Sequence, residues 1–342
     1  MVMLVILILL ALFYAFLNGY RDSSSILAGV IASRAMHPRA ALYLAGVAEF
    51  VAPFLFGVAV ARTVATGLVE PAAITLSTLV VAMLAALAWT LFAWWRGIPS
   101  SSSHALIGGL LGAALVAGGI QALKIGSLYK VLLPLFLAPP LGLVVGFLVM
   151  HIFLLVFGNA SPRINNLFRR MQIVTMVALA LSHSSNDAQK SIGIITLGLV
   201  LSGRLHAFSV PIGVVAACAA AIAFGASRGD WRLIRTLGGK IYRIRPVNAL
   251  ASQASSAGVI FTAAVAGAPV STSQVISMAL MGAGAAERVN KVRWHIGREM
   301  LVTWGFTIPA TIGTAILIYW GAYEIYHLRW VIGAILTWLS AG

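Results

Sequence analysis

The residues best suited to chemistry in this chain lie in one polar stretch, residues 181–193, with the sequence LSHSSNDAQKSIG. A carboxylate, two carboxamides and an amine stand close together there, in Asn186, Asp187, Gln189 and Lys190. The flanking residues are apolar, and the whole is long enough to cross a bilayer. Polar groups inside a membrane span are costly, and they persist mainly where they face a cavity, an ion or a substrate. The stretch is therefore a candidate site for a charged solute.

A second polar stretch, residues 18–26 (NGYRDSSSI), lies near the start of the chain. Among only eight acidic residues, Asp22, Glu49 and Asp187 stand in apolar surroundings away from loops. A carboxylate at the centre of a span costs about 2.5–3.5 kcal/mol on insertion scales, so each needs a cation, a proton or a basic partner. We expect these three acids to hold the coupling cation or proton, with a purely structural role as the alternative.

Basic and hydroxyl side chains indicate an anion as the solute. Lys190 and Arg21 either form ion pairs with neighbouring acids or clamp an oxyanion, and the two roles are compatible. Hydroxyl clusters at 100–103 and 271–273 follow a proline at a predicted helix break, where free N–H groups of a helix N-terminus attract anions. The candidate substrate-binding residues are Arg21, Ser25, Ser101, Ser102, Ser103, Asn186, Gln189, Lys190, Ser271, Thr272 and Ser273.

Composition determines which elements must position these residues. Hydrophobic residues make up 61% of the 342 and charged residues only 9%, and several apolar runs reach the length of a membrane span. We expect an all-α polytopic membrane protein with about 10–12 transmembrane segments.

The order of features along the chain occurs twice. Each half has a polar segment (18–26 and 182–191), then spans, then a Ser/Thr-rich hairpin that is re-entrant or broken (97–119 and 266–286), then a Pro-interrupted span. This predicts two repeats, residues 1–171 and 172–342. Duplication with interrupted helices in matching places is typical of secondary transporters.

Several function classes are excluded. The net charge of +15 comes mostly from Lys and Arg in loops beside spans, which indicates cytoplasmic loops and no nucleic-acid partner. The sequence has no P-loop, no GxSxG and no HExxH, so we expect neither an enzyme nor a cofactor beyond a coupling ion. His104 and His183 lack the spacing of metal ligands, which favours a hydrogen-bonding role in the core.

These motifs resemble those of the inorganic phosphate transporter (PiT) family. The resemblance rests on SHSSNDAQKSIGII at 182–195, PSSSSHALIGGLLGAAL at 99–115 and PVSTSQVISMALMGAGAAERVNKVRW at 269–294, and it covers essentially the whole chain. It implies an inverted-repeat carrier in the cell membrane, with two hairpins meeting at a central site. It also implies import of inorganic phosphate with sodium or protons, a sodium ion lying near Asp22 and Asp187, and a homodimer in the bilayer.

The first polar segment departs most from the family pattern. Arg21 stands where family members usually have Asn or His, and its fixed charge would disfavour a nearby sodium ion or retune the site toward another tetrahedral anion. A sulfate permease of the same fold is therefore the main alternative. An anion channel or a membrane scaffold without a transport cycle is the third hypothesis.

Overall fold

The computed structural model describes the backbone of residues 1–98, 100–230 and 244–340, and the side chains of these residues up to 323. The described residues form helices and no strand, with one isolated bridge between Val69 and Leu123. This confirms the all-α prediction. The helices are α1 (Val2–Ala32), α2 (Pro38–Leu55), α3 (Ala59–Thr66), α4 (Leu76–Arg96), α5 (Ser102–Gly118), α6 (Ile125–Phe157), α7 (Ile164–Leu201), α8 (Ile212–Arg228), α10 (Pro246–Val265), α11 (Thr272–Glu287) and α12 (Trp294–Ser340), with short 3-10 turns η1 (Pro71–Ala73), η2 (Gly119–Ala122) and η3 (Val289–Lys291).

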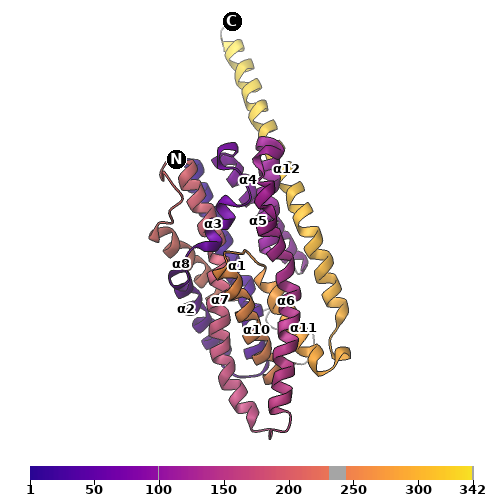
Figure 1. The fold of residues 1–342 in the computed structure, drawn as a ribbon. Helices are drawn as coiled ribbons and strands as arrows, with labels where there is room; N and C mark the ends of the chain where they lie inside the picture. The colour runs from indigo at the N-terminus through magenta and orange to yellow at the C-terminus, as the bar shows by residue number, and fades with distance from the viewer. Residues whose placement is uncertain (99, 231–243, 341–342) are drawn as a thin grey trace.

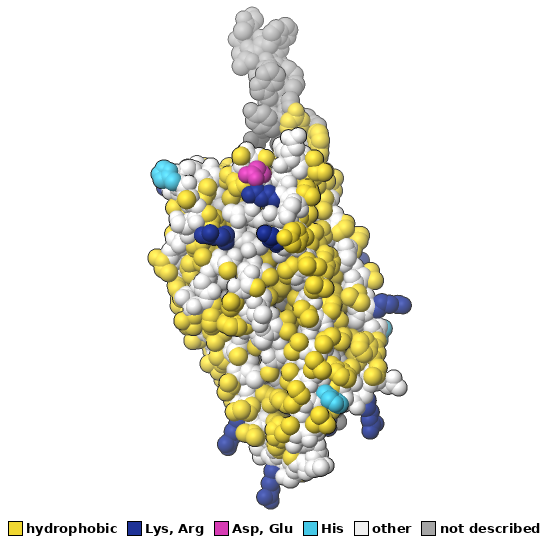
Figure 2. Space-filling model, viewed as in Figure 1, with side chains coloured by type: hydrophobic (Ala, Val, Ile, Leu, Met, Phe, Trp, Pro, Cys, Tyr) yellow, Lys and Arg dark blue, Asp and Glu magenta, His cyan; other side chains and the backbone are white. Residues whose placement is uncertain are grey.

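The described part of the chain contains five helices long and apolar enough to cross a membrane, or six if the bent pair α2 and α3 is one span. Helix α7 has the length but carries the polar residues of the second segment, which lowers its hydropathy. Large apolar side chains are exposed along most spans, as expected for surfaces that face lipid (Figure 2). The count of about 10–12 segments remains a prediction.

Both polar segments lie inside uninterrupted helices, 18–26 in α1 and 182–191 in α7. On α1 the polar segment 18–26 separates two apolar cores. Apolar residues between 7 and 17 belong to the first core, and apolar residues between 26 and 30 belong to the second. On α7 the order is reversed, because residues 176–180 belong to the second core and 188–197 to the first. The polar residues are therefore sandwiched between two apolar layers.

The predicted hairpins are helix pairs with a short break. The chain turns between the end of α4 at Arg96 and the start of α5 at Ser102, and between α10 and α11 at 266–271, so most of 97–119 and 266–286 is helical. Gly97 and Gly267 stand at equivalent places just after the first helix, and both have φ of +69°, where glycine is favoured. Serine occupies the N-cap position of the second helix in both hairpins, Ser101 and Ser271.

Helix packing follows a matched pattern. In the first hairpin α5 packs against α12, and in the second hairpin its counterpart α11 packs against α6. Likewise, α1 with the first polar segment packs against α8, and α7 with the second polar segment packs against α2. In Figure 1, α6 descends to the loop at the bottom of the view, whereas α12 ascends to the C-terminus. The predicted repeat boundary at residue 171 falls inside α7, and the nearest loop is 158–163.

Candidate functional site

Lys190 of α7 contacts both hairpin tips. Its ammonium group donates to Ser103 Oγ at 2.6 Å, in the first tip, and to the carbonyl of Val270 at 2.8 Å, in the second. It also forms an ion pair with Asp187, one turn earlier on the same helix. All of these side chains are buried. A buried ammonium ion at this junction is stabilised by its acid partner and by the hydroxyl and carbonyl dipoles.

The two tips also contact each other. Ser103 Oγ donates to the carbonyl of Val270 at 2.9 Å. Asn186 holds the second tip, since its amide donates to the carbonyl of Ala268 at 2.9 Å and its oxygen accepts from the N–H of Val270 at 3.2 Å. Residues predicted from separate parts of the sequence therefore meet at one place.

A buried acid cluster lies beside Lys190. His183 Nδ1 lies 3.0 Å from Glu49 Oε1, and its Nε2 lies 3.1 Å from Asp187 Oδ2 and 3.5 Å from Asp22 Oδ2. The Nε2 contacts are close but lack hydrogen-bond geometry. The Thr272 hydroxyl reaches Asp187 Oδ2 at 2.5 Å and Asp22 Oδ2 at 3.5 Å. All three acids predicted to handle the coupling charge are brought together around one histidine.

This cluster has the chemistry of a cation or proton site. One ligand atom each from Asp22, His183 and Asp187 lies within 4.8 Å of the others. Two carboxylates and the Thr272 hydroxyl offer oxygen ligands of the kind hard cations take. Glu49 paired with His183 offers a proton-accepting pair instead.

Other predicted substrate residues have different partners. Gln189 accepts from the N–H groups of Val60 and Ala61, at 2.8 and 3.2 Å, and donates to the carbonyl of Ser185 at 2.6 Å. Its amide therefore anchors the start of α3. Ser101 caps α5 by accepting from the N–H of His104 at 3.2 Å.

The remaining candidates lie around the tips. Arg21 donates to the carbonyl of Ser100 at 3.2 Å, and the carbonyl of Ser102 accepts from Tyr14 at 2.8 Å. Ser25 is half-buried on α1, and Ser273 is half-buried on α11. The buried Ser271 hydroxyl makes no side-chain capping bond.

Sequence reasoning gave too little weight to two residues at the site. The sequence favours a hydrogen-bonding core role for His183; the side chain is indeed buried and bonds to Glu49, but it also lies at the centre of the acid cluster. The signal was its spacing of four residues from Asp187, which puts both side chains on one helix face. Tyr14, fully buried, joins α1 to the first tip through the carbonyl of Ser102.

The chain is similar in sequence to known proteins along almost its whole length. The family model described as "Phosphate transporter family" matches residues 18–315. A probable low-affinity inorganic phosphate transporter of Bacillus subtilis (strain 168) is 40% identical over 320 residues, which cover 92% of this chain and 96% of that protein. One of Rhizobium meliloti (strain 1021) is 38% identical over 322 residues, which cover 94% of this chain and 96% of that protein.

A solved structure described as "The sodium-dependent phosphate transporter" has the same fold, with a TM-score of 0.88 and 22% identity, over 95% of this chain and 100% of that chain. The family match confirms the resemblance noted in the sequence, and the expectation of a transporter. The family match and the apolar helices together identify the chain as a multi-pass membrane protein. The chain belongs to the phosphate transporter family.

Proposed function

We propose that this chain is a secondary transporter that carries inorganic phosphate across the cell membrane together with sodium ions or protons. The observation that carries the proposal is the position of Lys190, whose ammonium group contacts both hairpin tips. A buried cation beside the N-termini of α5 and α11 attracts an oxyanion. The family and the names of the relatives make inorganic phosphate the substrate that we favour.

In this proposal phosphate binds between the two hairpin tips and replaces Asp187 as the ion-pair partner of Lys190. The hydroxyl groups of Ser103 and Thr272 lie within hydrogen-bonding distance of Lys190 and Asp187, respectively, so they are close enough to join the anion. Backbone N–H groups at the starts of α5 and α11 supply further donors. Additional substrate contacts stay predictions for Arg21, Ser25, Ser101, Ser102, Asn186, Ser271 and Ser273.

Such a displacement would couple the anion to a cation. When phosphate recruits Lys190, the Asp187 carboxylate loses its ion-pair partner in a buried environment. An uncompensated buried charge costs several kcal/mol, about 3–5 when one partner of a pair is removed. A sodium ion between Asp22, Asp187 and Thr272, or a proton on the cluster around His183 and Glu49, would remove that cost. Binding of anion and coupling cation would therefore be cooperative, as a symporter requires.

Alternating access is proposed to follow from two inverted repeats that divide near residue 171. The opposite directions of α6 and α12 support this (Figure 1), as do the matched helix contacts and the equivalent Gly97 and Gly267. Rocking of one repeat against the other would open the tip junction to each side in turn. A homodimer belongs to the same proposal, and cross-linking in native membranes would test it.

The decisive experiment is uptake of radiolabelled phosphate and sulfate into proteoliposomes under imposed sodium or proton gradients. We expect saturable phosphate uptake driven by one of the two gradients, with little competition from sulfate. Preferential sulfate uptake would replace the phosphate assignment by the sulfate alternative. Uptake of neither anion under any gradient would contradict the transporter proposal.

Asp187→Asn tests the coupling step. The variant keeps an acceptor for Lys190 and Thr272 but cannot bind a cation or proton as a carboxylate, so gradient-driven uptake should be lost while the protein still inserts. Glu70→Gln is the matched control, because Glu70 is partly exposed and pairs with Lys124 on the surface, 3.4 Å away. Gradient-driven uptake by Asp187→Asn at the rate of the control would remove Asp187 from the mechanism.

A further inference from the structure

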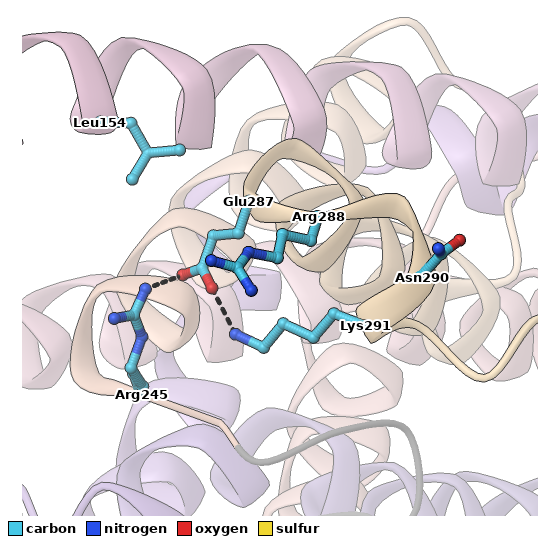
Figure 3. Close-up of a pocket in the computed structure, with 6 residues that line it drawn as sticks. All are labelled: Leu154, Arg245, Glu287, Arg288, Asn290 and Lys291. Atoms are coloured by element: carbon cyan, nitrogen blue, oxygen red, sulfur yellow. Dashed lines mark hydrogen bonds and ion pairs between the residues drawn. The ribbon is translucent and has the colours of Figure 1, made fainter.

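A basic cavity lies outside the proposed transport site, at the end of the protein where α10 begins and α11 ends (Figure 3). It has a volume of about 910 Å³. Its lining residues come from α6, the start of α10, the end of α11 and η3, and they are Leu154, Arg245, Glu287, Arg288, Asn290 and Lys291. Three cationic side chains share it with one carboxylate, a net charge of +2 (3 − 1).

The carboxylate of Glu287 fixes two of the cations. It accepts hydrogen bonds from Arg245 and Lys291, drawn as dashed lines in Figure 3, and from the amide of Asn248 at 2.7 Å. Glu287 is 10% exposed, whereas Arg245 is 56% exposed. The acid therefore lies beneath the cations, and the accessible part of the cavity is positive.

Arg288 is the third cation of the cavity, and within the described residues no ion pair neutralises its charge. Among the residues that the structure describes, no carboxylate lies within ion-pair distance of its guanidinium group. An arginine fork matches the oxygen geometry of a phosphate ester. The Lys291 side chain extends toward Glu287 beside Arg288, whereas the amide of Asn290 points away from these groups (Figure 3).

The surroundings of the cavity distinguish a lipid from a free anion. Leu154 lines it, and the neighbouring residues of α6, Ile152, Leu155 and Val156, are large, apolar and exposed. Acyl chains can therefore pack along α6 while a headgroup occupies the basic wall. The loop that directly follows α6, residues 158–163, also carries Arg163, and basic loops mark the cytoplasmic side, whose leaflet is rich in anionic lipid.

We propose that this cavity binds the phosphate headgroup of an anionic phospholipid, with Arg288, Lys291 and Arg245 as headgroup ligands and the exposed face of α6 as the acyl-chain surface. The site is separate from the tip junction around Lys190. It would hold the start of α10 and the end of α11 against α6, and so make the stability of the second hairpin depend on lipid composition.

The test is native mass spectrometry of the purified full chain, titrated with phosphatidylglycerol or with phosphatidylcholine. Phosphatidylglycerol should be retained more strongly than phosphatidylcholine, and Arg288→Gln should weaken its retention roughly fivefold. Arg39→Gln is the matched control, since it removes one exposed arginine from the start of α2, outside the cavity lining, and should leave retention unchanged. Arg288→Lys keeps the charge and should restore most of the retention.

Two results would overturn the proposal. Equal retention of phosphatidylglycerol by the unmodified protein, Arg288→Gln and Arg39→Gln would show that the lipid binds elsewhere. Displacement of phosphatidylglycerol by millimolar inorganic phosphate would identify the cavity as a free-anion site. Lys291→Gln gives the same comparison if Arg288→Gln does not fold.

Discussion

The ammonium group of Lys190 and the hydroxyl of Ser103 lie 2.6 Å apart, which ties a helix of the second half of the chain to the first hairpin tip. The same ammonium group reaches Val270 in the second tip and Asp187 on its own helix. One buried cation thus connects the two hairpins to the acid cluster. Any movement that separates the tips must break or replace these contacts.

Replacing Lys190 with glutamine should abolish most phosphate uptake. The variant loses the charge that we assign to the anion and leaves Asp187 without its ion-pair partner. Truncating one member of a buried charged pair costs about 2–5 kcal/mol, so we expect uptake to fall at least about 30-fold. The measurement is the initial rate in proteoliposomes, normalised to inserted protein. Ser103→Ala, which removes one neutral partner, should lose less, and uptake by Lys190→Gln within twofold of normal would contradict the assignment.

Replacing Gln189 should lower the stability of the fold and leave the affinity for phosphate unchanged. Its oxygen accepts from two N–H groups at the start of α3, and Gln189→Leu would leave these buried donors without a partner, at a cost of about 1–3 kcal/mol. We expect a lower Tm in detergent and an unchanged KM for phosphate in the fraction that folds. Gln189→Glu keeps the acceptor and should recover part of the Tm. A raised KM with an unchanged Tm would show instead that Gln189 binds the substrate, which is the role that the sequence predicts.

The crossing of α1 and α8 depends on glycine at position 225. A Cβ atom there would lie 2.1 Å from the carbonyl oxygen of Phe16, in the backbone of α1. Gly225→Ala must therefore shift one helix and should destabilise the protein by about 1–3 kcal/mol. Gly213→Ala is the control on α8, because beyond the adjacent backbone of its own helix no described atom lies within 4 Å of the added Cβ. Equal thermal unfolding curves for the two variants would show that this approach of the helices is not required.

The stabilising effect of Glu287 should depend on pH. Burial raises the pKa of this carboxyl, but hydrogen bonds from Lys291, Arg245 and Asn248 outweigh burial and hold the pKa below its ordinary value of 4.5. A depressed pKa means that the carboxylate stabilises the fold fully above the ordinary value, and that this contribution is lost as pH falls through the lower folded value.

The comparison is the Tm of the unmodified protein and of Glu287→Gln across pH 7 to the acid range. The unmodified protein should have the higher Tm at neutral pH, and the difference should shrink below a pH of about 4.5. A difference that stays constant with falling pH would show that the carboxylate charge does not contribute.

Much of the fold could be predicted because membrane helices are encoded locally. Long apolar runs define the spans, and a proline with a hydroxyl cluster predicts each break, which the structure has between α4 and α5 and between α10 and α11. The acids Asp22, Glu49 and Asp187 could be selected because a carboxylate in a span needs a partner, and they do lie together.

The sequence by itself thus determined the helical class, the two polar segments and the types of residue that form the site. Only the tertiary structure decided their partners, because those contacts join residues far apart in the chain. Lys190 and Ser103 are 87 positions apart, and Thr272 and Asp22 are 250 apart. The helical period fixes which face a side chain occupies, but packing decides what that face meets. Hence Gln189 anchors α3, whereas His183 joins the acid cluster.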